Sequence, residues 1–184
     1  VRYSDAPALT IAVWRLVFAV GLIGVFRMLS GGPRPHGREW LAAVVAGVFL
    51  AAHFWTWIAS IELTSVSSSV ALVCMQPVFV ALLSATFLGE HATRLQWIGI
   101  LVAVAGAFVI AWGDWGRGRD PLLGDALALS GAVLVSVYYV IGRRLRQRLD
   151  LWTYTGVVYS VAALVLLGAA LASGAELVHH PGRE

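Results

Sequence analysis

Long apolar segments follow one another along most of the chain, and short polar stretches separate them. A helix that crosses the hydrocarbon core of a bilayer needs about 17 to 25 predominantly apolar residues. Six segments meet this requirement, and their only charged residue is Arg15 in the first segment. The expected spanning helices are Ala6–Phe26, Trp40–Ile61, Thr64–Leu88, Leu95–Gly113, Ala126–Gly142 and Leu151–Ala175.

The period of this pattern and the composition favour the same fold class. Alternation of apolar and polar residues at a period of two, typical of membrane barrels, is absent, whereas helices satisfy their own backbone groups in lipid. Hydrophobic residues make up 59% of the chain and charged residues only 12%, about half the charged share of a soluble domain. The sequence therefore predicts an all-α membrane protein with six transmembrane helices, and it excludes an ordinary soluble enzyme, a disordered chain and a nucleic-acid binder.

The loops that alternate across the membrane differ in their arginine content. One set carries eight arginines and the other four, and the arginine-rich side of a membrane protein faces the cytoplasm. We therefore expect a multi-pass protein of the cell (inner) membrane whose Arg-rich loops 27–39 and 143–150 are cytoplasmic. The larger set is Arg27, Arg34, Arg38, Arg94, Arg143, Arg144, Arg146 and Arg148, and the smaller set is Arg2, Arg117, Arg119 and Arg183.

Polar side chains in the second segment fall on one face of the predicted helix. His53, Trp57 and Ser60 follow one another at spacings of four and three residues. Because 62–63 alone are expected to join the second and third helices, these helices form a hairpin and their polar faces can border one cavity. The alternatives remain open: a buried His can be a satisfied packing residue, and a helical Ser can bond its own backbone.

The third segment carries a matching polar face and a proline. Ser69 and Gln76 lie seven residues apart, and Pro77 follows Gln76 directly. A proline within a helix removes one backbone donor and frees a carbonyl, and freed backbone groups at membrane depth line a cavity or are paired by neighbouring helices. In the fifth segment, one phenol of Tyr138 and Tyr139 points inward, where a polar cavity can supply its hydrogen-bond partner.

Two charged residues have several interpretations. Arg15 can reach outward to the membrane surface, pair with carbonyls or an acid, or contact the substrate. Glu90 is either a solvated helix end or the partner of Arg94 or of another loop's arginine. We assign both to structural or gating roles. Because no nucleophile–base set, metal-ligand spacing or phosphate-binding loop appears, the sequence predicts no enzyme, no cofactor and no bound metal.

The stretch 65–90, which contains Gln76, Pro77 and Glu90, resembles the signature helix of EamA domains in the drug/metabolite transporter superfamily. The preceding hairpin and the stretch 97–113 fit the same domain. The first segment, with Arg15 inside it, resembles the family's second helix. Gly124-Asp125-Ala-Leu-Ala-Leu, followed by Tyr138 and the pair 143–144, resembles the start of a second EamA repeat.

This resemblance implies a ten-helix transporter built from two inverted repeats, of which the chain would be a fragment spanning helices two to seven. Residues 1–113 would be the first repeat without its first helix, and 114–184 the truncated start of the second. The implied function is secondary transport, often export, of small metabolites such as amino acids by alternating access. The expected partners are a solute and the lipid bilayer, a homodimer is left open, and the alternative is a non-transporting membrane assembly or scaffold subunit. Carried over by position, the substrate-cavity residues are His53, Trp57, Ser69, Gln76, Pro77 and Tyr138.

Overall fold

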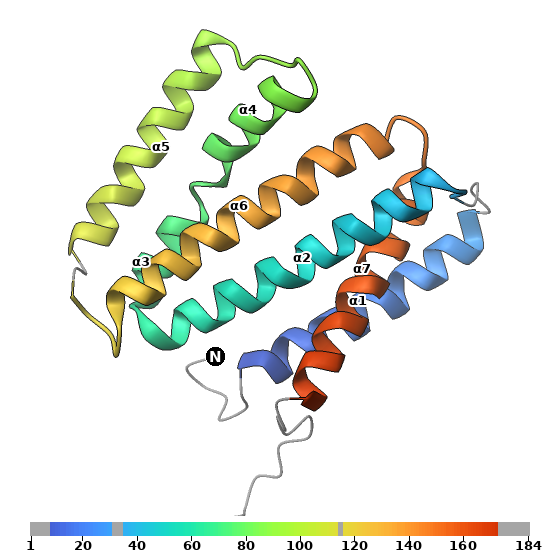
Figure 1. Ribbon diagram of the computed structural model, residues 1–184, viewed down its shortest axis with the longest axis horizontal. Coiled ribbons are helices and arrows are strands. Elements are labelled where there is room, and N and C mark those ends of the chain that lie inside the picture. The colour runs from blue at the N-terminus through green and yellow to red at the C-terminus, as the bar shows by residue number, and fades with distance from the viewer. Residues whose placement is uncertain (1–7, 31–34, 114–115, 173–184) are drawn as a thin grey trace, which may run out of the picture. The chain divides into compact units, whose positions relative to one another are not determined.

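Seven α-helices and no strand account for the regular structure of the residues that the computed structural model describes, which are 8–30, 35–113 and 116–172 (Figure 1). The chain passes from helix to helix through short connections. The helices are α1 (Ala8–Ser30), α2 (Arg38–Leu63), α3 (Val66–Val73), α4 (Gln76–Phe87), α5 (Arg94–Gly113), α6 (Pro121–Leu145) and α7 (Leu151–Ala172).

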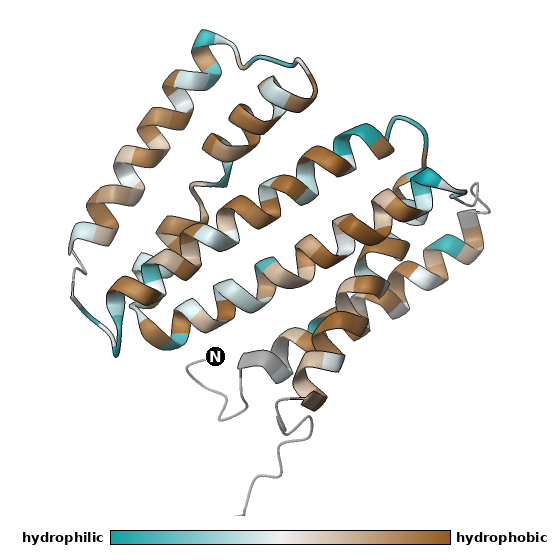
Figure 2. Cartoon of the chain, in the orientation of Figure 1, coloured by the Kyte–Doolittle hydropathy of each residue, from teal (hydrophilic) through white to brown (hydrophobic). Residues whose placement is uncertain are grey.

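Six stretches of these helices are long and apolar enough to cross a membrane, and α3 and α4 together make one of them. Apolar residues cover most of the length of each helix, and hydrophilic residues gather at the helix ends (Figure 2). The predicted all-α membrane fold with six spanning segments is therefore confirmed. The predicted start at Ala6, the predicted end at Ala175 and residues 31–34 of the first Arg-rich loop lie outside the described residues.

Several predicted boundaries are wrong because they stop where the apolar run stops. The fifth segment begins at Pro121, not Ala126, and continues past Gly142 to Leu145. Proline is well suited to the first turn of a helix, where its missing N–H costs nothing, and charged residues are tolerated at helix ends that reach the membrane surface. For the same reason α1 continues past Phe26 to Ser30.

The second and third predicted segments also differ from the structure. Because α2 continues to Leu63, the residues 64–65 join it to α3. Ser65 caps α3 by accepting a hydrogen bond from the N–H of Ser68 at 3.0 Å, as is typical of an N-terminal serine. The hairpin itself is present, with its turn shifted by two residues.

The third predicted segment is broken in the middle. The break separates α3 from α4 at residues 74–75, two residues before Pro77. Proline has no N–H to continue the α-helical ladder, and the chain tightens here: the N–H groups of Met75 and Val78 each bond a carbonyl three residues back, at 3.1 and 3.0 Å. The predicted effect of Pro77 on the backbone thus takes the form of two short helices in one membrane span.

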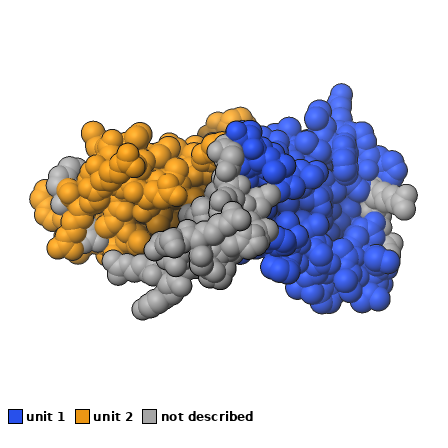
Figure 3. Space-filling model, turned by 90° about the horizontal axis from the view of Figure 1, so that it is seen from below, with its two compact units in different colours: residues 1–51, 145–184 blue, residues 52–144 orange. Residues whose placement is uncertain are grey.

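The described chain divides into two compact units (Figure 3). Unit 1 comprises residues 1–51 and 145–184, which include α1, the first half of α2 and α7. One stripe of α7 is buried at every fourth residue: Tyr154, Val158, Ala162, Leu166 and Ala170. At the end of α1, the rings of Phe26 and Trp152 stack with centroids 4.5 Å apart.

Unit 2 comprises residues 52–144, which include the second half of α2, α3, α4, α5 and α6. Helix α5 contacts α3 and buries only Ala107 within the described structure, so its remaining apolar side chains are left for lipid or for further protein. Ser60, Ser68, Ser69 and Ser136 are instead among the most deeply buried side chains of the unit. The interior of unit 2 therefore combines buried hydroxyls with small apolar side chains such as Ala128 and Ala132.

Close packing of α2 on α7 gives a test of unit 1. A methyl group added at Gly47 would lie 2.8 Å from the carbonyl oxygen of Val158 and 2.7 Å from the Cβ of Val161. Because backbone cannot move aside cheaply, we expect Gly47→Ala to lower the free energy of unfolding by about 1–3 kcal/mol, measured by thermal unfolding of the protein in detergent. Gly21→Ala in α1 is the matched control, since no described atom lies within 4 Å of its added methyl. Equal stability of the two variants would contradict this packing.

Candidate functional site

The polar faces of α2 and α3 meet in a pair of serines. The hydroxyl oxygens of Ser60 and Ser69 lie 2.5 Å apart, and both side chains are fully buried. Ser60 also donates its proton to the carbonyl of Trp57 at 2.6 Å, so the proton between the two hydroxyls belongs to Ser69. The two helices therefore adjoin through their polar faces, and Ser69 has its hydrogen-bond partner within the protein.

His53 connects α2 to α6 at the middle of its membrane span. Its Nδ1 lies 2.8 Å from the carbonyl oxygen of Gly131, and because a carbonyl can only accept, Nδ1 carries the proton. The side chain is buried, with 8% of its surface exposed. A neutral imidazole in this tautomer keeps Nε2 as a hydrogen-bond acceptor, and no described residue donates a hydrogen bond to Nε2.

Trp57 lies one turn further along the same face. Its indole stacks on the imidazole of His53, with centroids 5.9 Å apart and planes at 15°. Its Nε1–H is buried and has no hydrogen-bond partner among the described residues. A buried donor without an acceptor costs about 1–3 kcal/mol. Among the described residues, His53 and Trp57 together leave one acceptor, Nε2, and one donor, Nε1–H, unpaired.

The break between α3 and α4 is also held by α6. The single hydroxyl proton of Ser136 is shared between two carbonyls: that of Ala132, one turn back on its own helix, at 2.6 Å, and that of Gln76 at 3.1 Å. Gln76 is half-buried and Pro77 is exposed. The sequence reasoning missed Ser136, because a serine within a helix usually bonds only its own backbone.

The remaining predicted residues take no part in the hydrogen bonds described above. Tyr138 is half-buried and its ring is 5.1 Å from that of Tyr139, which is more exposed. Arg15 lies in α1 with an exposed side chain, and it belongs to unit 1, whereas the other predicted residues belong to unit 2.

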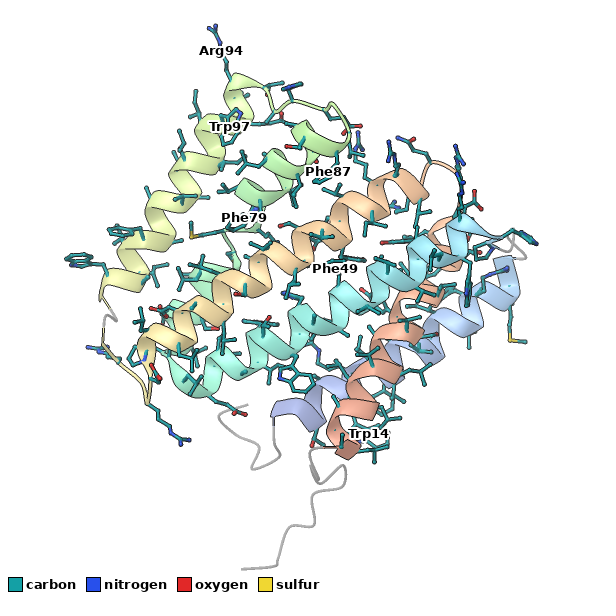
Figure 4. The ribbon with its side chains drawn as sticks, in the orientation of Figure 1. Trp14, Phe49, Phe79, Phe87, Arg94 and Trp97 are labelled. Atoms are coloured by element: carbon teal, nitrogen blue, oxygen red, sulfur yellow. The ribbon has the colours of Figure 1, made fainter. Side chains whose placement is uncertain are left out.

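Glu90 forms an ion pair with an arginine of α6. Its Oε2 lies 2.6 Å from Nε of Arg143, and both side chains are substantially exposed. The sequence left two partners open for Glu90: Arg94 or an arginine of another loop. The observed partner, Arg143, is of the second kind. Arg94 extends away from the start of α5 (Figure 4). An exposed pair of this kind contributes little to stability, and it joins the end of α4 to the last turn of α6.

Asp125 lies just outside the predicted segment Ala126–Gly142, and sequence reasoning did not select it as a site residue. It lies in the second turn of α6, and its Oδ1 accepts hydrogen bonds from the hydroxyls of Thr64 at 2.8 Å and Ser68 at 2.9 Å. Both donors are buried. A side chain at the neighbouring Gly124 would collide with the backbone N of Thr64, at 2.8 Å from its Cβ. The proline four residues earlier was the signal that the helix had already begun.

Comparisons with known proteins agree with this architecture. The EamA-like transporter family matches residues 1–112. The uncharacterized transporter YdfC of Bacillus subtilis is 29% identical over 136 residues, which cover 73% of this chain and 44% of YdfC. The uncharacterized inner membrane transporter YedA of Escherichia coli K12 is 29% identical over 178 residues, which cover 95% of this chain and 56% of YedA.

A relative from Archaeoglobus fulgidus, described only as an uncharacterized transporter, is 27% identical over 159 residues, or 84% of this chain and 55% of its own length. The chain thus spans about half the length of the curated relatives it matches. No solved structure matches it significantly. Six apolar spans and a family match over more than half of the chain lead to one conclusion: this multi-pass membrane protein belongs to the EamA-like transporter family.

Proposed function

We propose that the whole protein is a secondary transporter that exports small metabolites such as amino acids across the cytoplasmic membrane by alternating access. Membership of a transporter family supports a solute as the partner. In this proposal residues 1–113 and 114–184 belong to two inverted repeats of a ten-helix protein, and the Arg-rich loops face the cytoplasm. Solute sites of inverted-repeat transporters lie near the bilayer midplane, where helices are discontinuous.

The observation that carries the proposal is the pair His53 and Trp57 near the middle of a membrane span. Residue 53 lies near the centre of the span Arg38–Leu63, and the break at Gln76 lies near the centre of the span Val66–Phe87. A buried indole N–H without a partner offers a hydrogen bond to a solute oxygen, and the imidazole Nε2 beside it can accept one from a solute N–H or O–H. Both belong to unit 2, as do Ser69, Gln76, Pro77 and Tyr138.

Removal of a single N–H tests this assignment. Trp57→Phe keeps an aromatic ring beside His53 but loses the indole donor, so we expect kcat/KM for solute counterflow to fall about tenfold or more. The measurement uses the full-length protein in proteoliposomes and a panel of radiolabelled amino acids. Trp55→Phe is the matched control on the same helix, because the side chain of Trp55 is 49% exposed.

Gln76→Ala, at the break, is expected to lower the same rate without abolishing insertion into the bilayer. Equal transport rates in wild type, Trp57→Phe and Gln76→Ala would show that the solute path does not pass these residues. Loss of transport in the Trp55 control alone would point to the opposite face of α2.

Asp125 gives a separate test of how α6 is held. Asp125→Ala leaves the buried hydroxyls of Thr64 and Ser68 without their shared acceptor, so we expect a loss of about 2–4 kcal/mol in the free energy of unfolding. Asp125→Asn keeps an acceptor oxygen and should lose less. Asp120→Ala, which removes a single exposed bond of 3.3 Å to the N–H of Leu123, is the control, and thermal unfolding in detergent is the measurement. The same loss in all three variants would show that this contact is not specific.

A further inference from the structure

Arginines from three separate segments gather at one end of unit 1. Arg27 lies in the last turn of α1, Arg38 begins α2, and Arg146 and Arg148 lie between α6 and α7. The end of α1, the start of α2 and the loop before α7 lie at the same end of the unit (Figure 1). We call these four residues the arginine surface.

Membrane spans begin or end beside each member of this surface. The spans Ala12–Leu29 and Arg38–Leu63 include Arg27 and Arg38 in a terminal turn, and the span Leu151–Ala172 starts shortly after Arg148. The arginine surface therefore lies at the level of the lipid headgroups, where phosphate groups are the most abundant anions.

Contacts across the segments show that this surface is formed by the folded unit. Nη1 of Arg148 lies 3.9 Å from Oε1 of Glu39 in the first turn of α2. Arg27 is close enough to Asp150 for its charge to contribute to lowering the pKa of that carboxyl. Beside these residues, Phe26 of α1 stacks on Trp152 of α7.

The two acids at this end do not neutralise the four arginines. The Glu39 contact is long, and the side chain of Arg148 remains 76% exposed. Asp150 caps the N-terminus of α7. Its Oδ1 accepts a hydrogen bond from the backbone N–H of Thr153 at 3.0 Å, and its backbone carbonyl accepts one from the backbone N–H of Tyr154 at 3.1 Å. Partial burial raises the pKa of Asp150, but hydrogen bonds from Thr153 and Trp152 and the charge of Arg27 outweigh it and lower the pKa overall, so the carboxylate stays ionised. Four cations against two anions leave an excess of two positive charges on this end.

The guanidinium groups that carry this excess charge favour a phosphate as the ligand. A guanidinium presents several N–H donors in a planar arrangement that matches the oxygens of a phosphate. The indole of Trp152, stacked on Phe26, is an amphipathic ring of the kind that lies at the boundary between headgroups and acyl chains. A phosphate with an acyl chain attached would satisfy both features together.

We propose that the arginine surface binds the phosphate of an anionic phospholipid and thereby ties α1, α2 and the start of α7 together. The binding is independent of the transport proposed above, since it uses no residue of the solute path. Because the lipid phosphate contacts segments that are far apart in the sequence, its binding stabilises the folded state of unit 1.

The test compares lipids that differ only in headgroup charge. The full-length protein in detergent is titrated with dioleoyl-phosphatidylglycerol, with dioleoyl-phosphatidylcholine or with sodium phosphate at equal ionic strength, and both retained lipid and melting temperature are measured. We expect saturable retention of phosphatidylglycerol and a rise in Tm, with neither effect from phosphatidylcholine. An equal effect of sodium phosphate at the same concentration would overturn the lipid assignment.

A charge-matched pair of variants locates the site. Arg146→Gln with Arg148→Gln should weaken binding of phosphatidylglycerol about 25-fold, or about fivefold for each arginine. Arg117→Gln with Arg119→Gln makes the same change in charge in the connection between α5 and α6, and its affinity should stay within about twofold of wild type. Equal weakening in both pairs would show that overall charge, and not this surface, attracts the lipid. Should the first pair fail to fold, the exposed Arg38→Gln alone carries the test, and unchanged affinity there would contradict the proposal.

Discussion

Most polar side chains buried in unit 2 have hydrogen-bond partners within the protein, and helix α6 supplies several of those partners. Water is absent from the hydrocarbon core, so an unpaired hydroxyl, imidazole or carbonyl there is costly. The carbonyl of Gly131 accepts from His53, the hydroxyl of Ser136 reaches the carbonyl of Gln76, and Asp125 accepts from Thr64 and Ser68. These bonds fix how α6 can lie against α2 and α3.

Helix α6 also contacts the break in the span that α3 and α4 make together. Pro77 interrupts the backbone ladder, and the hydroxyl of Ser136 in α6 makes a further contact of 3.1 Å to the carbonyl of Gln76 beside the break. The small residues Gly124 and Gly131 let α6 approach closely enough for these bonds, since a Cβ at either place would press on Thr64 or Thr56. Sequence features that look unrelated, a proline in one helix and glycines in another, thus serve one arrangement.

The sequence was sufficient for the fold class and the number of spans, because hydrophobic length in a bilayer is a strong constraint. It was also sufficient for the neighbours α2 and α3, since a turn of two residues leaves no other choice. It was insufficient for helix ends: Asp125 and Arg143 are charged, so both were assigned to loops, although they lie within α6. With α6 drawn at its true length, Asp125, Ser136 and Arg143 are 11 and 7 residues apart and fall within about 20° of one face. That face carries the contacts of Asp125 and Ser136, which the sequence reasoning missed, and the ion pair of Arg143, which it left open as one of two alternatives for Glu90.

These contacts constrain how a transporter of this architecture can move. The bonds of Asp125, Gly131, Ser136 and Arg143 all join α6 to residues of the predicted first repeat, although α6 begins the predicted second repeat. If the two predicted repeats separated as rigid halves, the imidazole of His53 would lose its partner Gly131, and the contact of Ser136 with Gln76 would break. The ion pair between Glu90 and Arg143 is exposed and easily broken, whereas the contacts of Gly131 and Ser136 are buried. Under the proposed alternating-access mechanism, α6 would then move together with α3 and α4, and the moving bodies would differ from the two predicted repeats.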